Sequence, residues 1–186
     1  MILAISTSSP LASVAWIDAD GKVVWSGEQV APQRASEAIL KLLSELRETV
    51  DLKEATCVAV DLGPGSFTGV RVGVAIAKTM AWAHGLPTWG RTAFDLISAT
   101  QTVVVPSKRG EVFIRRPGEE PTRQAGLPTQ EAIGYGPLFE KPTFPKAERF
   151  AALVAEIEHQ SAANLLPAYF AEPSISTPKK PYRGEQ

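Results

Sequence analysis

The residues of this sequence best suited to bind an anion lie in one glycine-rich loop. The loop, GPGSFTG, occupies residues 63–69 and separates an apolar segment from a segment long enough for a helix. Its glycines permit positive φ angles and the close approach of another group. A helix that starts there would offer unpaired N–H groups and the positive end of its dipole. The loop therefore predicts either a phosphate cradle or a tightly packed junction of strand, turn and helix.

The loop fits neither common nucleotide-binding pattern. The Walker pattern places a lysine directly after its last glycine, where this sequence has Val70. The dinucleotide-binding pattern needs a third glycine at the position of Thr68. A phosphate site in this loop would therefore be of another kind.

The serine and histidine residues of this sequence do not match the spacings of hydrolytic enzymes either. Ser66 follows Gly65 directly and has no glycine two residues later, so it does not match the Gly-x-Ser-x-Gly nucleophile elbow. His84 and His159 are the only histidines, and no His-Glu-x-x-His zinc motif is present. We expect no catalytic residue, no metal site and no cofactor in this chain.

The composition is that of an ordinary globular domain. Of 186 residues, 44% are hydrophobic and 21% charged, which excludes bulk disorder. The net charge of −1 excludes a strongly basic protein that binds nucleic acid mainly by neutralising phosphates. Cys57 is the only cysteine, so an internal disulfide is excluded and a reducing compartment is favoured. The start does not resemble a signal peptide, and no apolar run reaches the roughly 18 residues of a membrane helix. We therefore expect a cytoplasmic protein.

The first half of the sequence predicts a sheet followed by helices. A turn at residues 18–21 and apolar β-rich runs predict a three-stranded meander. An amphipathic helix is expected over residues 36–50, with Ser36 as its N-cap. A second helix, residues 70–84, should end at Gly85. This second helix is apolar on nearly all sides, so it should be buried on more than one side, within its own domain or against another chain. The expected strands are residues 2–5, 11–17, 22–28 and 56–62.

The second half predicts shorter elements. We expect strands at 87–90 and 102–105, a short helix between them capped by Thr92, and a hairpin in which residues 112–116 pair back. Four apolar residues with helical spacing predict a last helix: Phe150, Leu153, Val154 and Ile157. The element order is that of an α/β fold with a mixed sheet.

Proline and aspartate change in frequency near residue 105. Residues 1–105 contain four prolines and the remaining residues eleven, whereas Asp95 is the last aspartate. Such a shift marks a boundary or a change to loop-rich structure. We therefore expect a first lobe over residues 1–105, a reduced second lobe over 106–172 and a tail over 173–186.

Several segments resemble the TsaB (YeaZ) family. They are ILAISTS at the start, RASEAILKLL before the first helix, DLGPGSFTGVRVGVAIAKTMA at 61–81, PSKRGEVF at 106–113 and LLPAYFAEP at 165–173. The resemblance implies an actin-like ATPase (ASKHA, ribonuclease H-like) fold of two lobes, with the second reduced. It also marks the loop motif of the family: Gly63, Pro64, Gly65, Ser66, Phe67, Thr68, Gly69 and Arg71.

The resemblance implies a role in threonylcarbamoyladenosine (t6A) modification of tRNA. In that pathway TsaC makes the adenylate and TsaD transfers the threonylcarbamoyl group. TsaB is a non-catalytic subunit that pairs with TsaD, and the ATPase TsaE joins the complex. We therefore expect a TsaD-like partner, a TsaE-like ATPase in a ternary complex, a homodimer in isolation and contact with tRNA only through the complex. The alternative is an autonomous small ASKHA-type phosphotransferase or hydrolase that uses the loop.

Three departures from the family pattern argue against metal-dependent ATP hydrolysis by this chain alone. Ser6 replaces an aspartate of the first hairpin, and its hydroxyl cannot hold a hard cation as a carboxylate does. Ala35 replaces a histidine, and Pro106 or Ser107 replaces a further aspartate.

The two predicted helices, 36–50 and 70–84, are expected to pack side by side. The resemblance implies that their remaining apolar face forms half of a four-helix interface with TsaD or with a second copy. The alternative is that these residues are internal core. In the tail, Lys179, Lys180 and Arg183 suggest either a tRNA contact or a solvated segment. The interface candidates are Ile39, Leu43, Leu46, Val74 and Met80.

Overall fold

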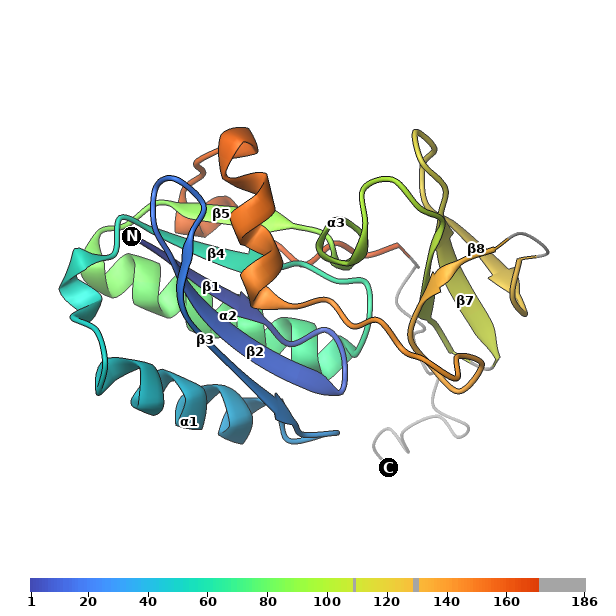
Figure 1. Cartoon of the computed structure of the whole chain (residues 1–186), viewed down its shortest axis with the longest axis horizontal. Coiled ribbons are helices and arrows are strands. Elements are labelled where there is room, and N and C mark those ends of the chain that lie inside the picture. Colours follow the sequence, from blue (N-terminus) through green and yellow to red (C-terminus); the bar gives the residue numbers. More distant parts are fainter. Residues whose placement is uncertain (109, 129–130, 171–186) are drawn as a thin grey trace, which may run out of the picture.

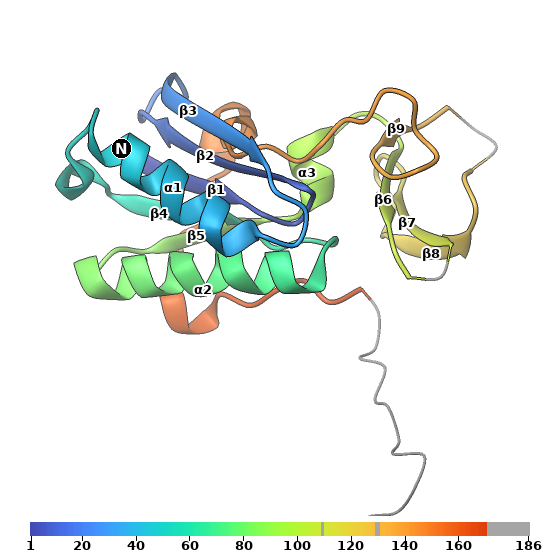
Figure 2. The same ribbon diagram turned by 90° about the horizontal axis from the view of Figure 1, so that it is seen from below.

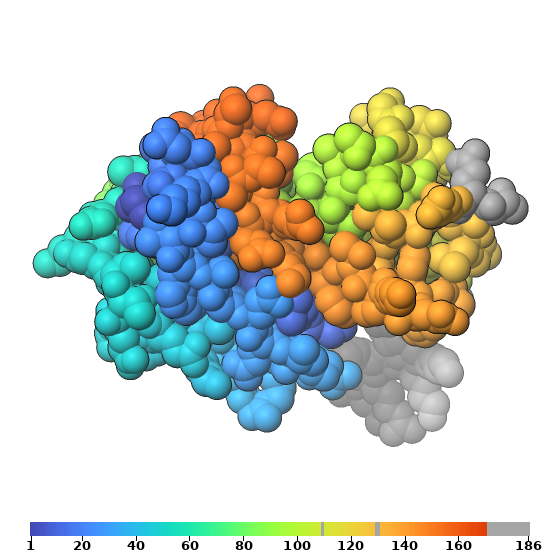
Figure 3. Space-filling view, in the orientation of Figure 1, coloured from blue at the N-terminus to red at the C-terminus, as the bar shows by residue number. Residues whose placement is uncertain are grey.

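The structure is a computed structural model and describes residues 1–108, 110–128 and 131–170. The tail cations considered above lie outside these residues. Two lobes lie side by side, a larger one with helices on a sheet and a smaller one rich in strands (Figure 1). The space-filling view shows the smaller lobe packed beside the larger one (Figure 3).

The first lobe contains a five-stranded mixed sheet in the order β3-β2-β1-β4-β5. The antiparallel pairs β1–β2 and β2–β3 confirm the predicted meander. β4 pairs in parallel with β1 and β5, as expected where helices connect the strands. The strands are β1 (Ile2–Ser6), β2 (Leu11–Ile17), β3 (Val23–Val30), β4 (Cys57–Asp61) and β5 (Thr88–Arg91).

Two layers cover this sheet, one on each face. Helices α1 (Ala35–Arg47) and α2 (Phe67–His84) lie on one face, and the 3-10 helix η2 (Ala147–Glu156) lies on the other (Figure 2). Alternate side chains of β1 enter the two layers: Leu3 and Ile5 pack with the α1–α2 core, whereas Ile2 packs with the η2 core. The predicted last helix is therefore present, but as a 3-10 helix.

The ends of the helices confirm two predictions and correct two. Ser66 caps α2 by accepting a hydrogen bond from the N–H of Gly69, so α2 begins three residues before the predicted start. Gly85 ends α2 in the left-handed conformation, and Thr92 caps α3 (Ala93–Ile97) through a capping box. The prediction that Ser36 caps the first helix is wrong, because α1 starts at Ala35 and Ser36 lies in its first turn.

Helix α2 has a core side, a flank held by a later segment, and an exposed side. Its core side includes Val70, Val74 and Ala77, which pack on the sheet and on α1. On the flank, Arg71 and Lys78 bond to residues 163–169. Exposed residues continue beyond this flank at spacings of four and three: Ala75, Thr79 and Trp82. The described residues thus leave part of this largely apolar helix uncovered.

The second lobe has a four-stranded sheet in the order β8-β7-β6-β9. The antiparallel pair β6–β7 confirms the predicted hairpin, whereas β8 and β9 were not predicted. Phe94 and Ile97 of α3 pack against one face of this sheet. The strands are β6 (Val103–Pro106), β7 (Glu111–Arg115), β8 (Thr122–Ala125) and β9 (Ile133–Gly134).

The chain returns to the first lobe after β9. Phe150 of η2 is fully buried against Trp89 of β5, with ring centroids 5.0 Å apart. Leu165, after the short 3-10 helix η3 (Ala162–Asn164), is buried in the core beneath α1 and α2. The range 106–172, assigned above to the second lobe, thus contains a part that packs on the first sheet.

Candidate functional site

The glycine loop turns sharply between β4 and α2 and lies tightly against the β1–β2 loop. Gly63 and Gly65 have φ angles of +85° and +156°, which other residues rarely adopt. Gly69 is helical, and its role is close approach: a Cβ there would lie 2.1 Å from the carbonyl oxygen of Thr7. The Thr7 hydroxyl in turn donates to the carbonyl of Gly69. The glycines therefore serve packing between the two loops.

Several N–H groups of the loop already have acceptors within the chain. The N–H of Ser66 donates to the carbonyl of Ser8 at 2.6 Å, and that of Gly63 donates to Asp61 Oδ1 at 2.8 Å. Tyr135 comes from the second lobe and donates from its hydroxyl to the same Ser8 carbonyl at 3.2 Å. A Cβ on Gly65 would lie 2.8 Å from that hydroxyl oxygen. The side of the loop that faces the second lobe is thus filled by protein groups rather than open to a phosphate.

Asp61, the last residue of β4, is the most strongly perturbed carboxylate of the described chain. Its side chain is fully buried and accepts hydrogen bonds from the hydroxyls of Ser6 and Ser8 as well as from Gly63. Burial raises the pKa of Asp61 above its ordinary value, and the hydrogen bonds from Ser8, Ser6 and Gly63 oppose that rise. Asp61 was not among the predicted site residues. The available signal was a carboxylate at the end of the apolar strand CVAVD.

Ser6 is part of the hydrogen-bonded junction around Asp61. Its hydroxyl lies 2.7 Å from Asp61 Oδ2 and 3.1 Å from the carbonyl oxygen of Pro145. A hydroxyl can donate to a neighbouring carboxylate, whereas a second buried carboxylate there would repel it. The serine thus supports a packed junction with one buried acid.

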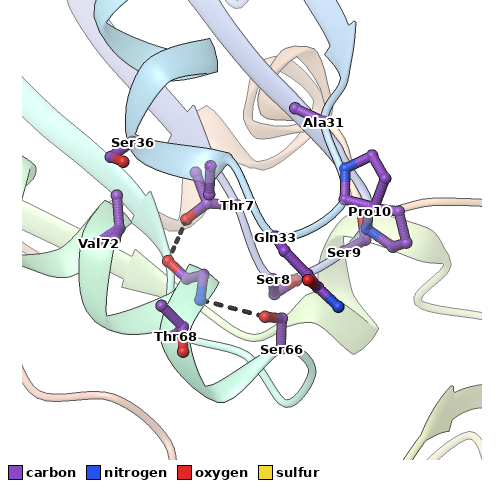
Figure 4. A pocket seen from close by; sticks show the side chains of 13 residues that line it. Thr7, Ser8, Ser9, Pro10, Ala31, Gln33, Ser36, Ser66, Thr68 and Val72 are labelled. Carbon is purple, nitrogen blue, oxygen red and sulfur yellow. Dashed lines mark hydrogen bonds between the residues drawn. The ribbon is translucent and has the colours of Figure 1, made fainter.

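A small pocket of about 220 Å³ lies beside the loop, where α1 and α2 begin (Figure 4). Ala35 is part of its wall. None of the pocket's lining residues is ionisable, so the pocket offers hydroxyls and helix starts but no general base and no charged ligand for a metal. The hydroxyl-bearing residues that line it are Thr7, Ser8, Ser9, Ser36, Ser66 and Thr68.

The remaining candidate groups do not join this site. Arg71 does not line the pocket: its guanidinium lies 3.7 Å above the ring of the loop residue Phe67, and its Nε donates to the Tyr169 hydroxyl at 3.4 Å. His84 and His159 are exposed at the ends of their segments. Among the described residues there is no group of three or more metal-ligating side chains, and no helix there could span a membrane.

The predicted interface residues divide into two groups. Ile39 and Leu46 are completely buried and Val74 is 4% exposed, so these three belong to the core between the helices and the sheet. Leu43 and Met80 are half-buried at the edge of that core. The strongly exposed apolar residues of the same helices are Leu40 at 62% and Trp82 at 81%.

Comparisons with known proteins agree with the fold and with the resemblance. The family described as TsaD: tRNA N6-adenosine threonylcarbamoyltransferase matches residues 28–100. A TsaB protein of Escherichia coli is 32% identical over 124 residues, which cover 60% of this chain and 52% of the relative. One from Bacillus subtilis is 28% identical over 122 residues, again covering 60% and 52%. The chain thus spans about half the length of the curated TsaB relatives it matches.

A longer match and two solved structures extend the comparison to most of the chain. An uncharacterised protein of Mycobacterium bovis is 28% identical over an alignment of 197 residues, which covers 92% of this chain and 92% of the relative. YeaZ from Pseudomonas aeruginosa superimposes with a TM-score of 0.73 at 22% identity, covering 90% of this chain and 99% of the other. A second Pseudomonas aeruginosa structure, similar to peptidase YEAZ, has a TM-score of 0.77 at 19% identity, with 91% and 99% covered. These findings confirm the resemblance to TsaB (YeaZ) proteins and the expected ASKHA-like α/β fold.

Proposed function

We propose that this chain, like the TsaB proteins it resembles, takes part in t6A modification of tRNA as a non-catalytic scaffold for a TsaD-like threonylcarbamoyltransferase. The chain would bind its partner through α1 and α2 and would contribute no reacting group. A TsaE-like ATPase would join the pair, and tRNA would be contacted only through the complex. In isolation, the same helices would pair two copies.

The observation that carries this proposal is the uncovered side of the two helices. Trp82 is 81% and Leu40 62% exposed, although a tryptophan normally buries most of its large apolar surface. Half-buried Leu43, Ile76 and Met80 extend the apolar surface to the edge of the core. Exposed aromatic and aliphatic residues of this kind are typical anchors of protein interfaces.

The predicted interface residues take two roles in this proposal. Leu43 and Met80 would touch the partner directly. Ile39, Leu46 and Val74 would act from the core by fixing how α1 and α2 lie on the sheet. A substitution at these three positions would therefore disturb folding before it reported on an interface.

The closed loop supports a non-catalytic role. Ser8 and Asp61 accept hydrogen bonds from the N–H groups of Ser66 and Gly63, and Tyr135 fills the side of the loop that faces the second lobe. The adjoining pocket has no ionisable lining residue to move a proton or to hold a metal. Nothing in this arrangement favours the autonomous phosphotransferase.

The variant Ala75→Glu tests the proposed face. Ala75 is exposed in the middle of the uncovered side of α2, so a glutamate there should change the free energy of unfolding by no more than about 0.5 kcal/mol. A carboxylate buried against a partner without a counter-charge is costly, so we expect affinity for the TsaD-like subunit to fall at least about ten-fold. Calorimetric titration of the purified chain into the separately purified TsaD-like subunit measures this change.

Ala152→Glu is the matched control. Ala152 is also an exposed alanine, but it lies in η2 on the opposite face of the sheet. This variant should bind like the wild type. Equal affinities of the Ala75→Glu variant and the wild type would contradict the proposed face.

A further inference from the structure

Residues 160–170 run along one flank of α2, from the β5 edge of the first sheet toward the second lobe. We call these residues the strap. Figure 2 shows the segment below α2, heading toward the smaller lobe. At its start, Gln160 exchanges two backbone hydrogen bonds of 2.8 Å with Thr88 of β5. The strap therefore begins as an extension of the first sheet.

The middle of the strap is held by the first lobe. Leu165 is completely buried in the α1–α2 core. Lys78 of α2 donates from its ammonium group to the carbonyls of Ala163 and Leu165, at 3.3 and 3.2 Å. The N–H of Ala168 donates to the carbonyl of Leu62 at 2.9 Å, next to the glycine loop. These contacts bind the strap along most of the length of α2.

The last residues of the strap join two different structures. Tyr169 lies on α2, where it accepts the hydrogen bond from Arg71 and packs against Phe67 with ring centroids 6.3 Å apart. Phe170 packs in the second lobe, edge-on to Phe94 at 5.7 Å and near Phe113 at 6.2 Å. Tyr169 and Phe170 are adjacent in the sequence, yet one contacts α2 and the other contacts the core of the second lobe.

The strap contacts two residues of the loop motif that do not take part in the junction between the glycine loop and the β1–β2 loop. Arg71 and Phe67 belong to the motif, yet neither takes part in the hydrogen bonds around Asp61. Their partner is Tyr169 instead. The motif therefore packs the junction with its glycines and holds the strap with its aromatic and cationic side chains.

We propose that the strap couples α2 to the second lobe. Through Lys78 and Arg71 it follows the position of α2, and through Phe170 it completes the core beneath β6 and β7. Loosening either end loosens the packing of the second lobe, while the sheet of the first lobe keeps its own core. The coupling does not depend on which partner binds α2.

Hydrogen exchange of the full chain, read by mass spectrometry, tests the coupling with Phe170→Ala. Loss of the ring removes aromatic contacts from the second-lobe core, so amides of β6 and β7 should exchange on the order of ten-fold faster. Amides of β1 and β4 should keep their wild-type rates. Leu166→Ala is the matched control, because Leu166 lies on the same strap but is 65% exposed.

A second variant tests the middle of the strap. Lys78→Met keeps the aliphatic stem but removes the donors to the Ala163 and Leu165 carbonyls. It should accelerate exchange in β6 and β7 by about three-fold, although Lys78 lies on α2. If Phe170→Ala does not fold, Phe170→Leu replaces it, with an intermediate acceleration expected.

Three results would overturn the coupling. The first is unchanged exchange in β6 and β7 in the Phe170 variant. The second is equal acceleration in β1 and β4, which would indicate general destabilisation. The third is an effect of Lys78→Met confined to α2, since the strap would then hold the helix without transmitting anything to the second lobe.

Discussion

Around the glycine loop, the fully buried Asp61 receives hydrogen bonds from two serines and a backbone N–H, and Tyr135 fills the remaining side. On the α1–α2 face, by contrast, Trp82 is 81% exposed and apolar residues lie open along the helices. Among the described residues, the polar groups around the loop have hydrogen-bond partners within the chain, whereas the apolar side chains on the helix face lack cover. This difference indicates that the loop maintains the fold, whereas the helix face is available to a partner.

The largest effect should come from Gly65→Ala, which would break the packed loop. The φ angle of Gly65 is +156°, and a Cβ would lie 2.0 Å from the carbonyl oxygen of Ser8. Both strain and clash should lower the free energy of unfolding by about 3 kcal/mol or more. Denaturant titration measures the loss.

Gly85→Ala separates strain from clash. Gly85 also has a positive φ, +65°, but nothing lies within 4 Å of its Cβ position. This substitution should lower the free energy of unfolding by only about 1 kcal/mol, the usual effect of placing a residue with a Cβ in the left-handed conformation. Equal losses in the two variants would show that the loop is not tightly packed.

A smaller, pH-dependent effect is expected from Asp61→Asn. Because burial raises the folded-state pKa of Asp61 above the ordinary value of 3.8, the folded chain holds this proton more tightly than the unfolded chain does. The contribution of Asp61 to stability is therefore greatest at low pH and declines as the pH rises above 3.8 through the folded-state pKa. Asparagine cannot ionise, so the variant should lack this decline, and the stability of the wild type relative to the variant should fall as the pH rises.

Denaturation midpoints at a series of pH values, for both proteins, measure that difference. A wild type that gains stability relative to the variant as the pH rises would contradict the raised pKa of Asp61. It would indicate that the three hydrogen bonds outweigh desolvation.

Nucleotide binding should give the smallest effect, namely none. Since donors of the loop are engaged and the pocket has no ionisable lining residue, calorimetry with ATP and magnesium should show no saturable heat for the isolated chain. Clear micromolar binding of ATP would contradict the conclusion that the loop is closed while the helix face is open. It would favour the autonomous enzyme instead.

Local patterns in the sequence predicted the elements of the first lobe well. Alternation and turn residues identified the meander, and helical spacing identified α1, because both patterns arise from burial of one face or stripe. The length of the segment and Gly85 at its end identified α2. The family resemblance, applied to apolar residues of these helices, placed Ile39, Leu46 and Val74 at an interface. A stripe of apolar residues does not reveal which surface covers it, and here the sheet covers these three.

Contacts between distant segments could not be predicted in this way. The two serines that donate hydrogen bonds to Asp61 are 53 and 55 residues away in the sequence, and the hydrogen bond from Tyr135 to Ser8 spans 127 residues. The strap reaches α2 over 98 residues in the Arg71–Tyr169 pair. No local spacing encodes such pairs, so the acid of the junction and the strap were missed, although their residues lay within or beside recognised motifs.

The most direct test of the central claim is t6A content in cells depleted of this chain. The account predicts that tRNA loses t6A on depletion, that the wild type and Ala152→Glu restore it, and that Ala75→Glu does not, although the variant folds. Unchanged t6A after depletion, or full restoration by Ala75→Glu, would contradict a scaffold that works through its helix face.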